Sequence, residues 1–384
     1  MNAEHGQLEH YQVRYGGILE KIFSLILAEE RRSVGLGILR VLASLIAWVY
    51  GGLVGLRNRL FDIGFIKSHR FNCRVISVGN LTTGGTGKTP MVLWLARFLL
   101  EEGRRVAIVS RGYRSENAGQ VLVVSDGQNI LVDSRMSGDE PQLLARRLPE
   151  IPVVCSPKRV LAVQTAIEKF QSEVIILDDG FQHRFLARDV DLVMLDSQNP
   201  FGNGRLFPRG ILREQTTALA RAQALVLSRF DGSEKAEENL TDLCRQWSDK
   251  PVFTMAHRPV RLFEPFTQQE RSLDSLQEVP LAAFAGIGRP NDFFGSVRDL
   301  GARLVYACSL PDHHPLSTEL LTALVRDSAE LEPELWLTTE KDWVRLPRVL
   351  PYNMELWVMT VELDVRDEGS RLKALIRKSL AAAT

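Results

Sequence analysis

Residues 75–103 read VISVGNLTTGGTGKTPMVLWLARFLLEEG, and this stretch decides the fold class. A short apolar run predicts a β-strand over 75–79, and a helical pattern follows over 89–103. Between them lies a loop rich in glycine. A strand, a glycine-rich loop and a helix form the local structure that a phosphate-binding loop requires. We therefore expect an α/β core with a P-loop NTPase-like parallel sheet built outward from this segment.

The loop over 79–90, GNLTTGGTGKTP, has the chemistry to hold a nucleotide. Its glycines allow backbone N–H groups to turn onto phosphate oxygens, and the N-terminus of the next helix adds its positive dipole end. Lys88 can reach the β- and γ-phosphates, and Thr89 offers a hydroxyl to Mg²⁺. We predict ATP and Mg²⁺ as cofactors, with the nucleotide bound along Thr82, Thr83, Gly84, Gly85, Thr86, Gly87, Lys88 and Thr89.

The loop departs from its commonest form, which has a glycine where Thr82 stands. Its glycine doublet resembles the G-G-x-G-K-[ST] loop of partition-type and nitrogenase-reductase-type ATPases. The signature lysine that precedes the doublet in those ATPases is Thr83 here. A partition- or metallochaperone-type ATPase switch is therefore one alternative function, and a nucleotide-gated membrane adaptor without catalysis is another.

Strand and helix patterns alternate along the rest of the chain, which predicts a parallel sheet covered on both faces. Further strands are expected at 105–110, 151–156, 173–179, 191–196 and 224–229. Extended chain with prolines at 252–265 is a candidate linker to a second, smaller α/β domain, and a basic helix is expected at 366–381. The expected division is a membrane-associated helical segment at 1–70, a P-loop core at 71–255 and the smaller α/β domain at 256–384.

The apolar stretch over 34–56, VGLGILRVLASLIAWVYGGLVGL, contains one charged residue, Arg40. About 20 apolar residues cross a bilayer core, and this stretch starts too late to be a cleaved signal. Three placements stay open: a buried hairpin of helices, a helix that spans the bilayer, and a helix that lies in the cytoplasmic leaflet. Two of them touch a membrane, so we expect a membrane surface as partner. Basic residues follow that would hold this side in the cytoplasm, namely Arg57, Arg59, Lys67, Arg70 and Arg74.

The composition excludes several classes of protein. Apolar residues make up 45% and charged residues 24%, as in a packed protein and unlike a disordered or collagen-like chain. The 47 basic and 47 acidic residues cancel, so no global basic field points to nucleic acid as a partner. The four cysteines contain no Cys-x-x-Cys pair, which argues against a zinc site and a disulfide framework.

Acidic residues mark a second part of the candidate site. The run VIILDD places Asp178 and Asp179 just past a strand, where a Walker-B-type carboxylate would hold Mg²⁺. Adjacent carboxylates repel each other unless a cation neutralises them. Asp139 and Glu140, in GDE at 138–140, precede a helix and would otherwise be a helix cap.

Three further motifs carry candidate polar side chains. His183 of DDGFQH could orient an acidic group or contact substrate, or it could be structural. PDHH at 311–314 sets a histidine beside an aspartate at a strand end, where it could orient a proton acceptor. The loop GRLFPRG at 204–210 contributes Arg205 and Arg209, and with Arg213 it could bind phosphates or an anionic substrate or simply be solvated.

In order and spacing, these motifs resemble the tetraacyldisaccharide 4′-kinases of Gram-negative lipid A biosynthesis. The resemblance runs from about residue 30 to residue 363. The pieces DDGFQH and GRLFPRG are rare elsewhere, so the match is specific. The matching motifs are VGNLTTGGTGKTP, SRGY (110–113), GDEP (138–141), LDDGFQH (177–183), GNGRLFPRGILRE (202–214), AGIGRPNDFF (285–294), PDHH (311–314) and TTEKDWVRL (338–346).

The resemblance implies phosphoryl transfer from ATP to the 4′-hydroxyl of an acylated glucosamine disaccharide 1-phosphate, which gives the bisphosphorylated lipid A precursor, lipid IVA. It implies an acid–base dyad of Asp139 and His313, with His314 as a local competitor for the histidine's role. Thr89, Glu140, Asp178 and Asp179 are the matching Mg²⁺ candidates. The lipid substrate stays in the bilayer, so the resemblance implies an active site on the cytoplasmic face of the inner membrane.

Overall fold

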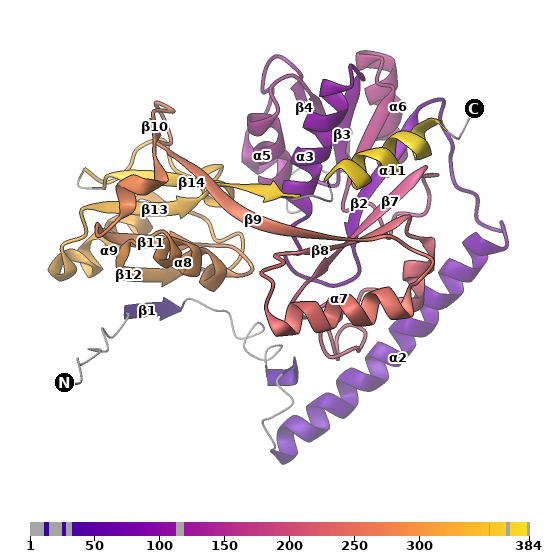
Figure 1. Cartoon of the computed structure of the whole chain (residues 1–384), viewed down its shortest axis with the longest axis horizontal. Helices are drawn as coiled ribbons and strands as arrows, with labels where there is room; N and C mark the ends of the chain where they lie inside the picture. Colours follow the sequence, from indigo (N-terminus) through magenta and orange to yellow (C-terminus); the bar gives the residue numbers. More distant parts are fainter. Residues whose placement is uncertain are drawn as a thin grey trace. The chain divides into compact units, whose positions relative to one another are not determined.

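The computed structural model describes residues 11–14, 25–27, 33–112, 119–352, 354–365 and 369–381. The chain divides into two compact units, shown in Figure 1. The larger comprises Leu19–Arg258 and Glu362–Thr384, and the smaller comprises Pro259–Val361 with Met1–Ile18. The chain passes between the units inside strands β9 (Val252–Phe263) and β14 (Leu356–Asp364). Tyr113 of the SRGY motif lies outside the described residues, and the expected three-part division stays a prediction.

The larger unit is built on a mostly parallel sheet with the strand order β9-β8-β7-β2-β6-β3-β5-β4. The edge strand β4 runs antiparallel to β5, and the other neighbouring pairs are parallel. The prediction of an α/β fold is confirmed; the predicted parallel sheet is mostly parallel, because its edge strand β4 is antiparallel. The strands are β2 (Arg74–Asn80), β3 (Val106–Ser110), β4 (Leu122–Asp126), β5 (Pro152–Cys155), β6 (Val174–Asp178), β7 (Val190–Asp196) and β8 (Ala224–Ser228).

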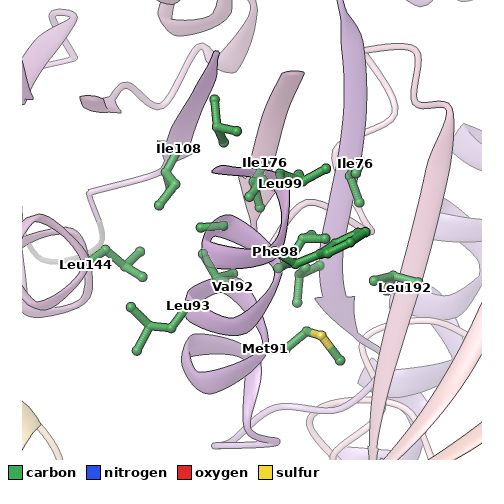
Figure 2. Close-up of a cluster of buried hydrophobic side chains, with 14 of the residues drawn as sticks. Ile76, Met91, Val92, Leu93, Phe98, Leu99, Ile108, Leu144, Ile176 and Leu192 are labelled. Carbon is green, nitrogen blue, oxygen red and sulfur yellow. The ribbon is translucent and has the colours of Figure 1, made fainter. Parts of the chain in front are cut away.

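Helices cover both faces of this sheet because its strands are apolar on both sides. On one face, Met91, Phe98 and Leu99 of α3 pack against Ile76 and Ile176 of the strands, as Figure 2 shows. The same buried cluster includes side chains of α5 and α11. Alternate strand residues such as Val75 face α6 on the other side. The helices are α3 (Lys88–Glu101), α4 (Ser134–Ser137), α5 (Asp139–Arg147), α6 (Arg159–Phe170), α7 (Glu234–Gln246) and α11 (Gly369–Ala381).

The smaller unit has a second parallel sheet with the order β1-β12-β11-β13-β14. Because the carboxyl ends of parallel strands meet at one edge, the loops after β11, β12 and β13 lie together there. The strands are β1 (Tyr11–Arg14), β11 (Pro280–Ala285), β12 (Arg303–Ser309) and β13 (Leu335–Thr339), and β10 (Glu270–Arg271) pairs with the end of β9. The helices are α8 (Pro290–Asp299), α9 (Thr318–Asp327) and α10 (Glu340–Trp343).

One side of helix α2 (Val34–Asp62) packs against the rest of the larger unit, and its opposite side is apolar. Ala43, Ala47 and Phe61 are buried, and the Tyr50 hydroxyl donates to the Arg213 carbonyl at 2.8 Å. By length and composition, it is the one helix in the described ranges that could cross a membrane. Most of its large apolar side chains are exposed, which does not agree with the alternative of a buried hairpin of helices. Its exposed large apolar side chains are Val34, Ile38, Val41, Leu42, Leu45, Ile46, Trp48, Val49, Leu53 and Leu56.

Candidate active site

The phosphate loop connects β2 to α3 and has the backbone that its glycines allow. Gly84 has a φ of 108° and Gly87 a φ of 78°, in the left-handed region that favours glycine. Gly87 caps the helix that begins at Lys88, so the first N–H groups of α3 lie next to the loop. The structure thus joins a glycine-rich turn to a helix N-terminus, as the sequence predicts.

Polar residues at the end of β8 form hydrogen bonds to this loop, and His257 of β9 lies next to it. Ser228 Oγ donates to the Thr86 carbonyl at 2.8 Å, and Arg229 Nη2 donates to the Gly85 carbonyl at 2.5 Å. Arg229 also donates to Asp196 at 2.6 Å. A Cβ atom at Gly87 would lie 2.7 Å from Nε2 of His257, so a larger residue does not fit there.

The first two residues of the predicted nucleotide site are bonded within the protein. Thr82 forms an isolated antiparallel bridge with Leu212, and the Thr83 amide donates to the Ile211 carbonyl at 2.7 Å. Because the Thr83 amide is already used, the loop from Gly84 to Thr89 is the better-suited part of the segment for phosphate groups.

Asp179 lies between two cations. Lys88 Nζ is 3.6 Å from Asp179 Oδ1, and Arg213 Nη1 is 2.9 Å from both oxygens of this carboxylate. Burial alone raises the pKa of Asp179, but Lys88 and Arg213 more than offset this and bring it to about 2. Asp179 is therefore ionised at neutral pH and links the phosphate loop to the segment after β7.

Asp178 has the opposite environment. Its side chain is buried, Oδ2 accepts a hydrogen bond from Ser110 Oγ at 3.1 Å, and Oδ1 has no partner among the described residues. Burial, then the charges of Glu140 and Asp179, raise its pKa to about 7. Glu140 is thus close enough for its charge to act on Asp178.

This carboxylate environment fits Mg²⁺. The orphaned oxygen of Asp178, the neighbouring carboxylates and the Thr89 hydroxyl are oxygen ligands of the kind that Mg²⁺ prefers. Within the described ranges, no three His, Cys, Asp or Glu side chains gather closely enough to hold a metal by themselves. Mg²⁺ commonly takes few protein ligands and adds substrate phosphates, so the two observations agree.

The two members of the predicted dyad belong to different units. Asp139 is half-buried in the first turn of α5, after Gly138 at the helix N-cap. His313, in the smaller unit, follows β12 with a φ of 62°, and its Nε2 is 3.7 Å from Asp312 Oδ2. The amide of His314 donates to the Pro311 carbonyl at 3.0 Å. The pairing of Asp139 with His313 stays a prediction.

The residues predicted to bind substrate are dispersed within the larger unit. His183 Nε2 is buried without a hydrogen-bond partner in the described structure, and burial followed by Arg159 and Arg188 lowers its pKa to about 4. Buried Arg209 donates to the Ile26 carbonyl at 3.4 Å, and Arg205 lies in an exposed loop. Arg213, which the sequence marked only as part of this basic loop, is the arginine that reaches Asp179.

Several residues of the site were missed in the sequence. Ser110, Ser228 and Arg229 are polar residues at or just after the ends of apolar strands, and ligands bind at the carboxyl edge of such sheets. Their position at the strand ends is the signal by which the sequence could have indicated these residues. Arg159, buried at the start of α6 and acting on Asp179 through its charge, gave no comparable signal.

The phosphate loop, the carboxylates beside it and the mostly parallel sheet define a P-loop nucleotide-binding protein. The chain belongs to the LpxK family of tetraacyldisaccharide-1-P 4′-kinases, whose family model matches residues 39–381. The resemblance found in the sequence is therefore confirmed, and membership of a kinase family decides against the partition-type switch and the non-catalytic adaptor.

Individual relatives agree over most of the chain. The tetraacyldisaccharide 4′-kinase of Anaeromyxobacter sp. (strain K) is 41% identical over 331 residues, which cover 85% of this chain and 87% of the relative. That of Desulfatibacillum aliphaticivorans is 37% identical over 354 residues, covering 90% and 94%. The crystal structure of the "apo" form of LpxK from Aquifex aeolicus in complex with ATP matches with a TM-score of 0.72 and 34% identity, and covers 89% of this chain and 99% of that one.

Proposed function

We propose that this protein transfers the γ-phosphate of ATP to the 4′-hydroxyl of a tetraacyldisaccharide 1-phosphate and so makes the bisphosphorylated lipid A precursor. Family membership over residues 39–381 supports this activity. The observation that carries the proposal is local: Lys88 of the phosphate loop lies 3.6 Å from Asp179, beside the buried Asp178. A loop for phosphates and carboxylates for a cation are thus adjacent in one unit.

The phosphate loop binds and orients the nucleotide. Backbone N–H groups of Gly84–Thr89 and the N-terminus of α3 receive the phosphate oxygens, and Lys88 neutralises charge on the transferred group. Thr89, Glu140, Asp178 and Asp179 would hold Mg²⁺, which when bound neutralises charge that develops on the phosphates. Arg213 keeps Asp179 ionised and adds a second cation to the loop.

The acceptor needs a base because a sugar hydroxyl has a pKa far above 7 and is a weak nucleophile. Asp139 takes the hydroxyl proton in this proposal, and His313 holds and polarises the Asp139 carboxylate. The hydroxyl oxygen then forms the new bond to phosphorus as the bond to the β-phosphate oxygen breaks. His183, Arg205 and Arg209 are the proposed contacts for the anionic disaccharide.

Helix α2 provides the proposed contact with the membrane. Its apolar side chains are exposed on one side, while Tyr50 and Asn58 on the other side bond to the loop at Arg213 and Glu214. A helix that spans the bilayer would have to leave these contacts, so a helix lying in the leaflet suits the structure better. This placement sets the active site on the cytoplasmic face of the inner membrane, where the acylated substrate lies.

The identity of the product tests the proposal. Purified protein is incubated with ATP, Mg²⁺ and the tetraacyldisaccharide 1-phosphate in detergent micelles, with a parallel reaction in EDTA. We expect mass spectrometry and ³¹P NMR to show one added phosphate monoester at the 4′ position in the Mg²⁺ reaction only. A phosphate at another position would contradict the proposed acceptor, and equal product in EDTA would contradict the role of Mg²⁺.

A further inference from the structure

The motif TTEKDWVRL in the smaller unit has no part in the chemistry described so far, yet it contains a buried ion pair. Arg345 Nη2 lies 2.5 Å from Asp342 Oδ1, and the exposed fractions of the two side chains are 8% and 0%. Taking two charges out of water costs more than their attraction returns unless further hydrogen bonds satisfy them. The groups that form these further hydrogen bonds therefore indicate the role of the ion pair.

The pair is fixed locally by a short capped helix. Thr339, the N-cap of α10, accepts from the Asp342 amide at 3.3 Å, and its hydroxyl donates to Asp342 Oδ2 at 2.6 Å. Arg345 lies in the turn that follows α10, and its amide donates to the Asp342 carbonyl at 2.9 Å. The sequence thus aims both charged groups at the edge where β11, β12 and β13 end.

Both charged groups bind the peptide of Gly286, directly after β11. The Gly286 amide donates to the two oxygens of Asp342 at 3.1 and 3.2 Å, and its carbonyl accepts from Arg345 Nη2 at 2.9 Å. The same carbonyl accepts from the His313 amide at 3.3 Å. A Cβ atom at Gly286 would lie 3.0 Å from Asp342 Oδ1, so any larger residue would crowd the carboxylate.

The pair also binds the chain just after His313. Arg345 Nη1 donates to the His314 carbonyl at 3.0 Å. His313 itself has a φ of 62°, a backbone conformation that non-glycine residues keep only when the surroundings fix it. Arg345 therefore bonds to the Gly286 carbonyl, which also accepts from the His313 amide, and to the carbonyl of His314, the next residue.

We propose that Asp342 and Arg345 are positioning residues for His313: their ion pair holds the peptides of Gly286 and His314 and so fixes the backbone from which the histidine projects. This inference rests on the proposed role of His313 in phosphoryl transfer. A pair retained only for stability would gain as much from apolar packing, whereas these groups bond to loop backbone at the strand ends. Lysine cannot replace Arg345, because an ammonium lacks the guanidinium fork that reaches both carbonyls.

The test compares kcat, the KM for ATP and thermal unfolding for Arg345→Lys and for the charge-neutral double variant Asp342→Asn/Arg345→Met. The double variant leaves no buried unpaired charge and so guards against simple unfolding. We expect kcat for lipid phosphorylation to fall about 100-fold in both, the effect of misplacing a catalytic group, with the KM for ATP within about 2-fold. Thr338→Val, which loses a buried hydrogen bond to the Phe284 carbonyl at 3.1 Å, is the control and should keep wild-type kcat.

A double-mutant cycle with His313→Ala separates positioning from general damage. Adding Arg345→Lys to His313→Ala should lower kcat by no more than about 2-fold, because the histidine through which Arg345 acts is already absent. Multiplicative losses, or a Thr338→Val control that is equally slow, would overturn the positioning role alone. Full turnover in His313→Ala would instead remove the dyad, and this inference with it.

Discussion

Two neighbouring aspartates at the end of β6 have pKa values that are shifted in opposite directions. Asp179 has a pKa of about 2 because Lys88 and Arg213 offset its burial, whereas burial beside Glu140 and Asp179 raises the pKa of Asp178 to about 7. Separate environments of this kind give adjacent carboxyl groups different roles. Asp179 connects the phosphate loop to Arg213, and Asp178 has an oxygen without a hydrogen-bond partner that can coordinate a cation.

The first prediction concerns the proposed base. Asp139→Ala should lower kcat for lipid phosphorylation by about 10²- to 10⁴-fold, the range that general base catalysis contributes. ATP affinity should be unchanged because the phosphate loop lies on other elements. Steady-state kinetics together with nucleotide titration check both parts. Turnover close to wild type in this variant would remove Asp139 as the base.

The second prediction concerns His257, which packs against Gly87. Burial, followed by the charge of Arg229, lowers the pKa of His257 to about 4, below its ordinary value of 6.5. A lowered pKa means that the neutral form stabilises the fold and that this stability is lost as pH falls from about 6.5 to about 4. Relative to His257→Gln, the wild type should lose on the order of 3 kcal/mol of unfolding free energy over that window. Urea unfolding between pH 4 and 8 measures it, and parallel curves for the two proteins would show that His257 does not contribute.

The limits of the sequence are clearest at single residues. Lys88 and Asp179 were predicted separately, and the structure brings them within 3.6 Å. Arg213 was seen only as part of a basic loop, because sequence spacing does not tell which arginine of three reaches the carboxylates. Arg209 of the same loop, predicted as a substrate contact, donates to the Ile26 carbonyl. Such choices depend on how a loop folds back on the sheet, which local pattern does not encode.

Among the elements, α2 shows what hydropathy can and cannot predict. Its apolar character was evident from the sequence, but the face that packs on the larger unit is set by polar contacts far along the chain. Glu214, buried in the loop after Arg213, accepts hydrogen bonds from Arg57 at 3.2 Å, Asn58 at 2.9 Å and Arg221 at 2.8 Å. Arg57 therefore neutralises a buried acid, and not all of the basic flank is available to a membrane.

The third prediction tests the exposed face of α2. Leu45→Glu/Leu53→Glu places two charges where these side chains are 59% and 64% exposed, so the fold should tolerate the change. Binding to vesicles that contain anionic lipid should fall about 10-fold or more, because a charge at an apolar contact costs several kcal/mol. Sedimentation with vesicles measures this.

Two controls accompany the α2 variant. Val349→Glu changes a side chain that is 69% exposed in the smaller unit and should leave vesicle binding unchanged. ATP binding should also be unchanged in the α2 variant. Undiminished vesicle binding by Leu45→Glu/Leu53→Glu would show that the apolar face of α2 is not the membrane contact.

Across the whole molecule, most strands and the class of fold could be predicted because each strand is a local apolar run. Strands β4 and β1 were not predicted, because they are short strands at sheet edges and leave little local pattern. Helix α11 was expected from its basic amphipathic pattern, but that pattern does not identify the partner. In the structure, Leu372 and Ile376 pack in the same cluster as Phe98, so the end of the chain belongs to the larger unit.

The neutral overall charge also becomes interpretable for the molecule as a whole. Some of the 47 basic and 47 acidic residues pair at specific places in the structure. Carboxylates gather at Asp178 and Asp179 beside Lys88, and buried ion pairs such as Asp342–Arg345 hold loops at the strand ends. The balance of charge thus includes internal ion pairs in both units.

We propose that the phosphate loop serves transfer to a lipid acceptor and not hydrolysis of ATP. The most direct measurement is the ratio of ADP formed to phosphorylated lipid formed, in micelles with and without the tetraacyldisaccharide 1-phosphate. We expect one ADP for each phosphorylated lipid, and almost no ADP when the lipid is absent. Steady ADP release with no phosphorylated lipid would contradict it.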